Sequence, residues 1–122
     1  MNFPNSLQHL NIGDNKLERI DEVTFPTNLK YLRLDGNENL EITSAFPNSL
    51  EHLELSGFTN LKNWGNLEFP DGLKKLQLDS CDIGDYIEKI DLPESLELLT
   101  LGNNGITNID CLKNLTNLKL IC

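Results

Sequence analysis

The sequence has few basic residues, few cysteines and no long apolar run. Ten lysines and arginines stand against nineteen acidic residues, which gives a formal net charge of -9. Nucleic acids and anionic lipids attract clustered Lys and Arg, so neither is expected as the main partner. Three cysteines, an odd number, do not indicate a disulfide framework. No stretch is typical of a membrane span or a secretory signal. We therefore expect a cytoplasmic protein with reduced thiols that binds neither nucleic acid nor membrane.

Motifs of catalysis and metal binding are missing as well. The sequence has no nucleophile elbow, no paired-cysteine or zinc-protease motif, and no phosphate-binding glycine loop. Residues 35–39 open like a calcium-binding loop, but Leu40 and Phe46 stand where that loop needs Gly and Glu. We expect a chain that is not an enzyme and that holds no metal or cofactor.

What the chain does have is a period of about 22 residues. Its five prolines lie 21 to 23 residues apart, at Pro4, Pro26, Pro47, Pro70 and Pro93. Each follows a large apolar residue: Phe3, Phe25, Phe46, Phe69 and Leu92. Each is followed by leucines at fixed offsets, as in Leu29, Leu32 and Leu34 after Pro26. Self-similarity at a fixed period indicates a repeat architecture.

The phrase L-x-x-L-x-L at this period resembles the leucine-rich repeat family, in its proline-containing subclass. The resemblance implies an α/β-type leucine-rich-repeat solenoid: a right-handed coil with a short-stranded parallel sheet on its concave face, mostly extended or irregular convex segments and little helix. It covers residues 1–122 as one domain. About five repeats start near the residues before the prolines, and a partial sixth starts from Asn114.

The resemblance also implies an Asn after the strand whose side-chain amide binds backbone groups of the turn, at Asn15, Asn37 and Asn104, with Cys81 as a familiar replacement. Phe58 departs from this pattern, so we expect a less regular backbone there. A second apolar pair should follow in each turn: Leu17 with Ile20, Leu40 with Ile42, Leu61 with Trp64, Ile83 with Tyr86, and Ile106 with Ile109. The phenylalanines before the prolines should form one packed column, because a residue that precedes proline is extended.

Residues between the inward leucines should point outward, since strand side chains alternate. This predicts one outward column of His9, Tyr31, His52, Lys75 and Leu98, and a second of Asn11, Arg33, Glu54, Gln77 and Thr100. A third, at the strand ends, holds Gly13, Asp35, Ser56, Asp79 and Gly102. Tyr and Arg are typical anchors of protein interfaces. The predicted partner-binding residues are therefore His9, Asn11, Tyr31, Arg33, His52, Glu54, Lys75 and Gln77, with Tyr31, Arg33, His52 and Glu54 at the centre. Simple solvation of these side chains is an equally good interpretation.

A metal shared by His9 and His52 is the less favoured interpretation of that column. Two strand spacings separate their backbones by about 10 Å. Both rings would have to lean across Tyr31, and no further ligand is obvious. An exposed His-Tyr-His strip that contacts a partner fits the pattern better.

The leading hypothesis is a protein-binding module that uses its concave sheet. The alternatives are a substrate-recognition segment of a ubiquitin-ligase-type or effector protein, and a structural spacer without its own ligand. No polar capping unit is visible at either end, which predicts either a fragment of a longer array or end-to-end self-association.

Overall fold

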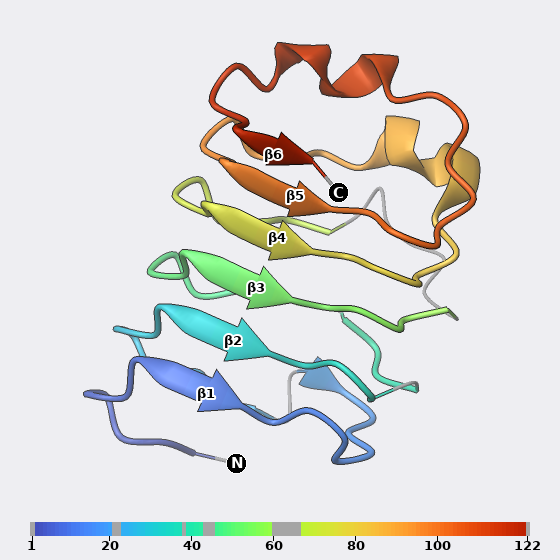
Figure 1. The fold of residues 1–122 in the computed structure, drawn as a ribbon. Coiled ribbons are helices and arrows are strands. Elements are labelled where there is room, and N and C mark those ends of the chain that lie inside the picture. The colour runs from blue at the N-terminus through green and yellow to red at the C-terminus, as the bar shows by residue number, and fades with distance from the viewer. Residues whose placement is uncertain (1, 21–22, 38, 43–45, 60–66, 122) are drawn as a thin grey trace.

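The computed structural model describes residues 2–20, 23–37, 39–42, 46–59 and 67–121. Six short strands form a single parallel sheet in chain order (Figure 1). They are β1 (His9–Asn11), β2 (Tyr31–Arg33), β3 (His52–Glu54), β4 (Lys75–Gln77), β5 (Leu98–Thr100) and β6 (Leu120–Ile121). The 3-10 helices η3 (Gly84–Lys89) and η4 (Asp110–Asn114) lie in the segments that precede β5 and β6. The chain thus has a repeat-type, mostly-β fold, as the 22-residue period predicts.

Each strand begins after the same proline turn. The proline carbonyl accepts the N–H of the leucine three residues later in all five repeats, for example from Leu29 to Pro26 at 3.3 Å and from Leu73 to Pro70 at 3.1 Å. At the first position of this turn proline contributes only its carbonyl, so its missing N–H costs the turn no hydrogen bond. The turn then delivers the chain into the strand, whose middle leucine points inward. This turn was not predicted from the sequence.

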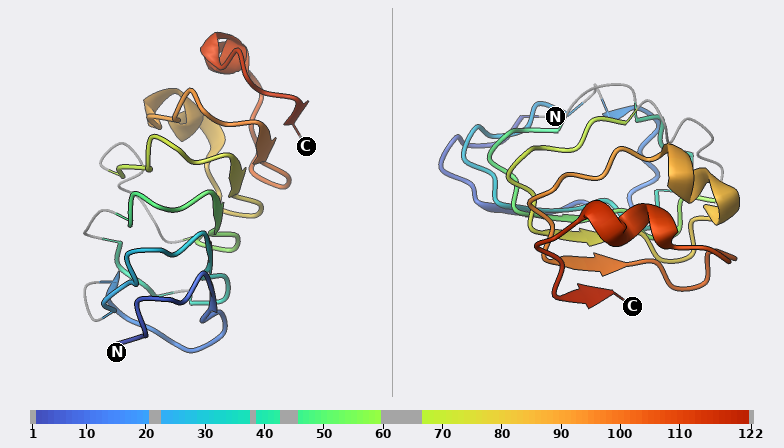
Figure 2. Two further views of the ribbon diagram at one scale, coloured as in Figure 1. Left: turned by 90° about the vertical axis from the view of Figure 1, so that its left-hand side faces the viewer. Right: turned by 90° about the horizontal axis from the view of Figure 1, so that it is seen from above.

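The inward leucines form one buried row, as predicted. Register pairs Leu10, Leu32, Leu53, Leu76 and Leu99 in succession, and the four after Leu10 have no exposed surface. Figure 2 shows the strands superposed along one side of the chain, with the return segments opposite. One buried cluster contains both strand leucines, such as Leu53, and residues of the return segments, such as Ile87. Within the described residues, no helix is long and apolar enough to cross a membrane.

The polar positions after the strands behave largely as expected. Among the described residues, Asn37 and Asn104 are the buried polar ones. Asn15, by contrast, is exposed, and its side-chain amide donates to the Gly13 carbonyl at 2.8 Å. Cys81 replaces Asn in its turn and is fully buried, with its thiol donating to the carbonyl of Leu55 at 3.3 Å. The predicted irregularity at Phe58 is not present at residues 55–59. Phe58 is buried, and the neighbouring Gly57 N–H donates to the Asp79 carbonyl at 2.9 Å, as Asp14 N–H does to Asp35.

The second apolar positions need a correction in the last two complete turns. Tyr86 is 39% exposed and Ile109 is 50% exposed, whereas Ile87 and Leu112 are buried. The prediction assumed extended segments, but η3 and η4 wind the chain there and turn different residues toward the core. The pairs Leu17 with Ile20 and Leu40 with Ile42 are buried as predicted. Leu61 and Trp64 lie outside the described residues.

The phenylalanine column is partly confirmed. Phe46 and Phe69 are buried and stacked, with ring centroids 6.4 Å apart and planes 2° from parallel. Phe3 and Phe25 are only partly buried against the same core. Packing therefore accounts for this column, and no aromatic ligand site is needed.

Candidate functional site

The two outward columns of the sheet form a continuous surface, here called the strand face. Parallel register aligns His9 with Tyr31, His52, Lys75 and Leu98, and Asn11 with Arg33, Glu54, Gln77 and Thr100. All eight predicted partner-binding residues therefore lie side by side on β1 to β4. The strands determine this arrangement because the leucine between each outward pair is held in the core.

Three aromatic rings lie in contact along the first column. The rings of His9 and Tyr31 stack at 5.5 Å between centroids, with 29° between planes. The rings of Tyr31 and His52 meet edge to face at 4.8 Å. The predicted His-Tyr-His strip is thus continuous. Tyr31 occupies the space between the two histidines, and the described residues contain no group of three side chains that could hold a metal ion.

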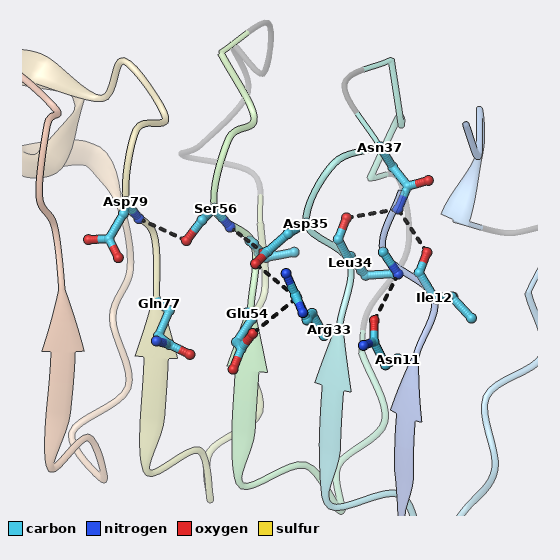
Figure 3. Close-up of polar contacts among 12 residues, drawn as sticks. Asn11, Ile12, Arg33, Leu34, Asp35, Asn37, Glu54, Ser56, Gln77 and Asp79 are labelled. Carbon is cyan, nitrogen blue, oxygen red and sulfur yellow. Dashed lines mark hydrogen bonds and ion pairs between the residues drawn. The ribbon is translucent and has the colours of Figure 1, made fainter. Parts of the chain in front are cut away.

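Glu54 is the hub of the polar contacts on this face. Its Oε1 accepts the Tyr31 hydroxyl at 3.0 Å and lies 3.4 Å from His52 Nε2. Its Oε2 lies 3.4 Å from Arg33 Nε (Figure 3). Burial, and then the hydrogen bond to Glu54, raise the pKa of Tyr31, so the phenol stays protonated and keeps donating. The four central residues predicted from the sequence therefore form one bonded cluster, here called the Glu54 cluster.

Gln77 extends the Glu54 cluster to β4. Its Oε1 lies 2.9 Å from His52 Nε2. Since the amide oxygen can only accept, the His52 ring must carry its proton on Nε2 in this arrangement. Each polar side chain of the cluster is thus fixed by at least one neighbour, which limits the rotamer entropy that binding would cost.

A second set of bonds, at the strand ends, was not assigned a role from the sequence. Asp35 Oδ2 accepts from Arg33 Nε at 3.2 Å, and its Oδ1 accepts the backbone N–H of Ser56 at 2.7 Å. The Ser56 hydroxyl in turn accepts the N–H of Asp79 at 3.2 Å. Burial raises the pKa of the Asp35 carboxyl, while the bonds from Ser56 and Arg33 oppose that rise. The recurring short polar residue in the third outward column was the available signal for this ladder.

Charges also alternate along the positions just before the strands. Lys30 Nζ lies 3.9 Å from Glu51, which lies 3.8 Å from Lys74, and Lys119 lies 2.8 Å from Glu97. These exposed pairs each contribute little to stability. The sequence already shows this alternation, at the position two residues before each inward leucine, but it was missed. This alternation of charge favours the observed order of the strands, because pairing a strand with the one two turns away would place like charges next to each other.

Comparison with known families identifies part of this region. Residues 18–58 match the FNIP repeat. The FNIP segment covers about a third of the chain and contains β2 and β3, and thus Tyr31, Arg33, His52 and Glu54, whereas Gln77 lies outside it. A search of curated proteins found no match to the chain. At a coarse level, a repeat segment of this kind points to a protein-interaction module.

The FNIP match corrects the family expected from the sequence. The matching family is the FNIP repeat, which is distinct from the leucine-rich repeats, so the predicted leucine-rich-repeat membership is wrong. The physical reason is that regularly spaced inward leucines indicate only that each turn contains a strand that stacks on its neighbours. That requirement is common to repeats of about this length and does not by itself separate one family from another.

Proposed function

We propose that the chain is a protein-binding module and that the strand face contacts the partner, with the Glu54 cluster at the centre of the contact. The observation that carries this proposal is the gathering of three side chains around the Glu54 carboxylate on an open sheet surface: the hydrogen bond of Tyr31, the ion pair of Arg33 and the 3.4 Å contact of His52. The side chains of Arg33 and His52 remain 40% and 28% exposed. The cluster is therefore held in place and still accessible.

The chemistry of the Glu54 cluster suits a protein partner. Tyr and Arg dominate the energetic centres of interfaces, since a fixed aromatic ring or guanidinium offers a large contact area at low entropic cost. Six strands about 4.8 Å apart span roughly 25 Å, the width of a small standard interface. The proposal includes the finer architecture expected from the period, a single coil of stacked turns with the strand face on its inner side. It assigns the chain no catalytic role.

Paired substitutions test this function. The intact chain is immobilised, and proteins captured from cells that express it are compared between wild type and Tyr31→Ala/Arg33→Ala. Lys89→Ala, in η3 on the return side, is the matched control at another exposed cation beside a tyrosine. We expect the double variant to lose a defined partner that the control retains. Equal capture by all three proteins would contradict the strand-face proposal, and no capture by any would favour the structural spacer.

A further inference from the structure

Asp35 and Asp79 occupy equivalent places two turns apart. Each lies two residues after the end of its strand, β2 or β4. In each case Oδ1 accepts, at 2.7 Å, a backbone N–H from the equivalent place in the next turn, Ser56 for Asp35 and Gly102 for Asp79. The two carboxylates are thus held in the same way by the backbone.

The two aspartates differ in their cationic partner. Arg33, at the end of β2, places its Nε 3.2 Å from Asp35 Oδ2. The equivalent residue of β4 is Gln77, and its side-chain oxygen contacts His52 instead. Asp79 Oδ2 accepts the hydroxyl of Thr100 at 3.1 Å. Among the described residues, no lysine or arginine lies within salt-bridge distance of Asp79. Figure 3 shows Gln77 turned away from Asp79 while Arg33 reaches Asp35.

An apolar position lies on the same face, nearer the start of β5. Leu98 starts β5 opposite Lys75 and lies two residues, about 7 Å along the strand, before Thr100, whose hydroxyl contacts Asp79. Leu98 is only partly buried, and its register partner Leu120 is 49% exposed. The charge of the whole chain, -9, further favours a cationic group on the partner.

We infer that the partner segment at the strand face carries an arginine or lysine that pairs with Asp79, and an aliphatic side chain, nearer the start of β5, that packs on Leu98. This rests on the proposed function of the strand face. The ion pair between Arg33 and Asp35 shows the expected arrangement: the partner's cation pairs with Asp79 after β4 as Arg33 pairs with Asp35 after β2. Arginine is the better match, since its planar guanidinium can bond the carboxylate while its stem covers apolar surface.

A displayed library of random 12-residue peptides, selected on the intact chain, tests this inference. Binders are then remeasured as synthetic peptides by fluorescence anisotropy. The decisive variant is Gln77→Arg, which supplies an internal partner for Asp79 in the manner of Arg33 without removing any carboxylate. Gln8→Arg is the matched control, because it adds the same charge at an exposed position before β1. Thermal melting verifies that each variant folds.

We expect selected peptides to be enriched in Arg or Lys together with an aliphatic residue. Their affinity should fall at least about tenfold with Gln77→Arg or Asp79→Asn, and stay within about twofold with Gln8→Arg or Asp85→Asn. Peptides without an enriched cation, peptides indifferent to Gln77→Arg, or a selection that yields no binder would each overturn the inference. If such peptides still lose affinity with Tyr31→Ala, the strand face binds and only the assignment of Asp79 fails. If no change on the strand face affects them, the proposed function fails too.

Discussion

The side-chain amide of Asn37 donates to the carbonyl oxygen of Ile12, 3.0 Å away and one turn earlier in the chain. The same nitrogen donates to Leu34 in its own turn at 2.8 Å. Asn37 Oδ1 accepts the backbone N–H groups of Asn15 and Leu17. One buried side chain thus bonds two successive turns through four hydrogen bonds, of which Figure 3 shows those to Ile12 and Leu34.

Asn37→Ala should therefore weaken the junction between the first two turns. It leaves buried backbone groups without partners, and each such group costs about 1–3 kcal/mol. We expect the free energy of unfolding in urea to fall by about 2–4 kcal/mol. The exposed Asn39→Ala is the control and should change it by less than about 0.5 kcal/mol. Similar losses in both variants would show that the bonds of Asn37 have no structural role.

Gly36→Ala should be poorly tolerated for two reasons. Gly36 has φ of +80°, in the left-handed region that disfavours a Cβ. An added Cβ would also overlap the Asp14 carboxylate of the preceding turn. We expect a loss of about 1–3 kcal/mol of stability, measured by thermal melting. Gly72→Ala, where a Cβ meets no atom within 4 Å, should leave the melting temperature nearly unchanged. Equal melting temperatures of the two variants would contradict the close approach of these turns.

The corrected helical phase predicts opposite outcomes for two neighbouring aliphatic residues. Leu112→Ala removes a buried side chain and should cost about 2–5 kcal/mol. Ile109→Ala removes a half-exposed one and should cost under about 1 kcal/mol. Urea denaturation of both variants decides the matter. A larger loss at Ile109 would restore the extended segment expected from the sequence.

Asp35 should give the chain a distinctive pH dependence. Its pKa is raised in the folded state, mainly by burial, so the folded protein binds this proton more tightly than the unfolded chain does. The contribution of Asp35 to stability is therefore full below the unfolded-state pKa and declines as pH rises through the folded-state pKa. Asp35→Asn should remove that decline. The free energy of unfolding of the variant should therefore lack the part of the decrease between about pH 3 and pH 6 that Asp35 causes in the wild type. A carboxyl carbon signal of Asp35 that titrates below the ordinary aspartate range by NMR would reverse the sign.

Much of the fold could be predicted because the strand positions are dictated locally. Alternation around Leu53 or Leu76 determines which side chains face outward, and a period of 21 to 23 residues brings those of successive turns into register. The outward columns, and thus the neighbours in the Glu54 cluster, followed directly. The bonds within the cluster did not, because they depend on rotamers. The helical segments were missed because the spacing of Ile87 and Ile90 indicates a helical turn only when the path of the chain between β4 and β5 is known. Family membership failed because leucine spacing describes a stacking geometry that several families share.

The two tyrosines of the chain provide the most direct test of the strand-face proposal. Tyr31 lies in the Glu54 cluster, whereas Tyr86 lies in η3 on the return side and is 39% exposed. Hydroxyl-radical footprinting of the intact chain, with and without its captured partner, measures the reactivity of both side chains in one sample. The strand-face proposal predicts that partner binding protects Tyr31, together with His52, and leaves Tyr86 as reactive as before. Protection of Tyr86 with unchanged Tyr31 would contradict it.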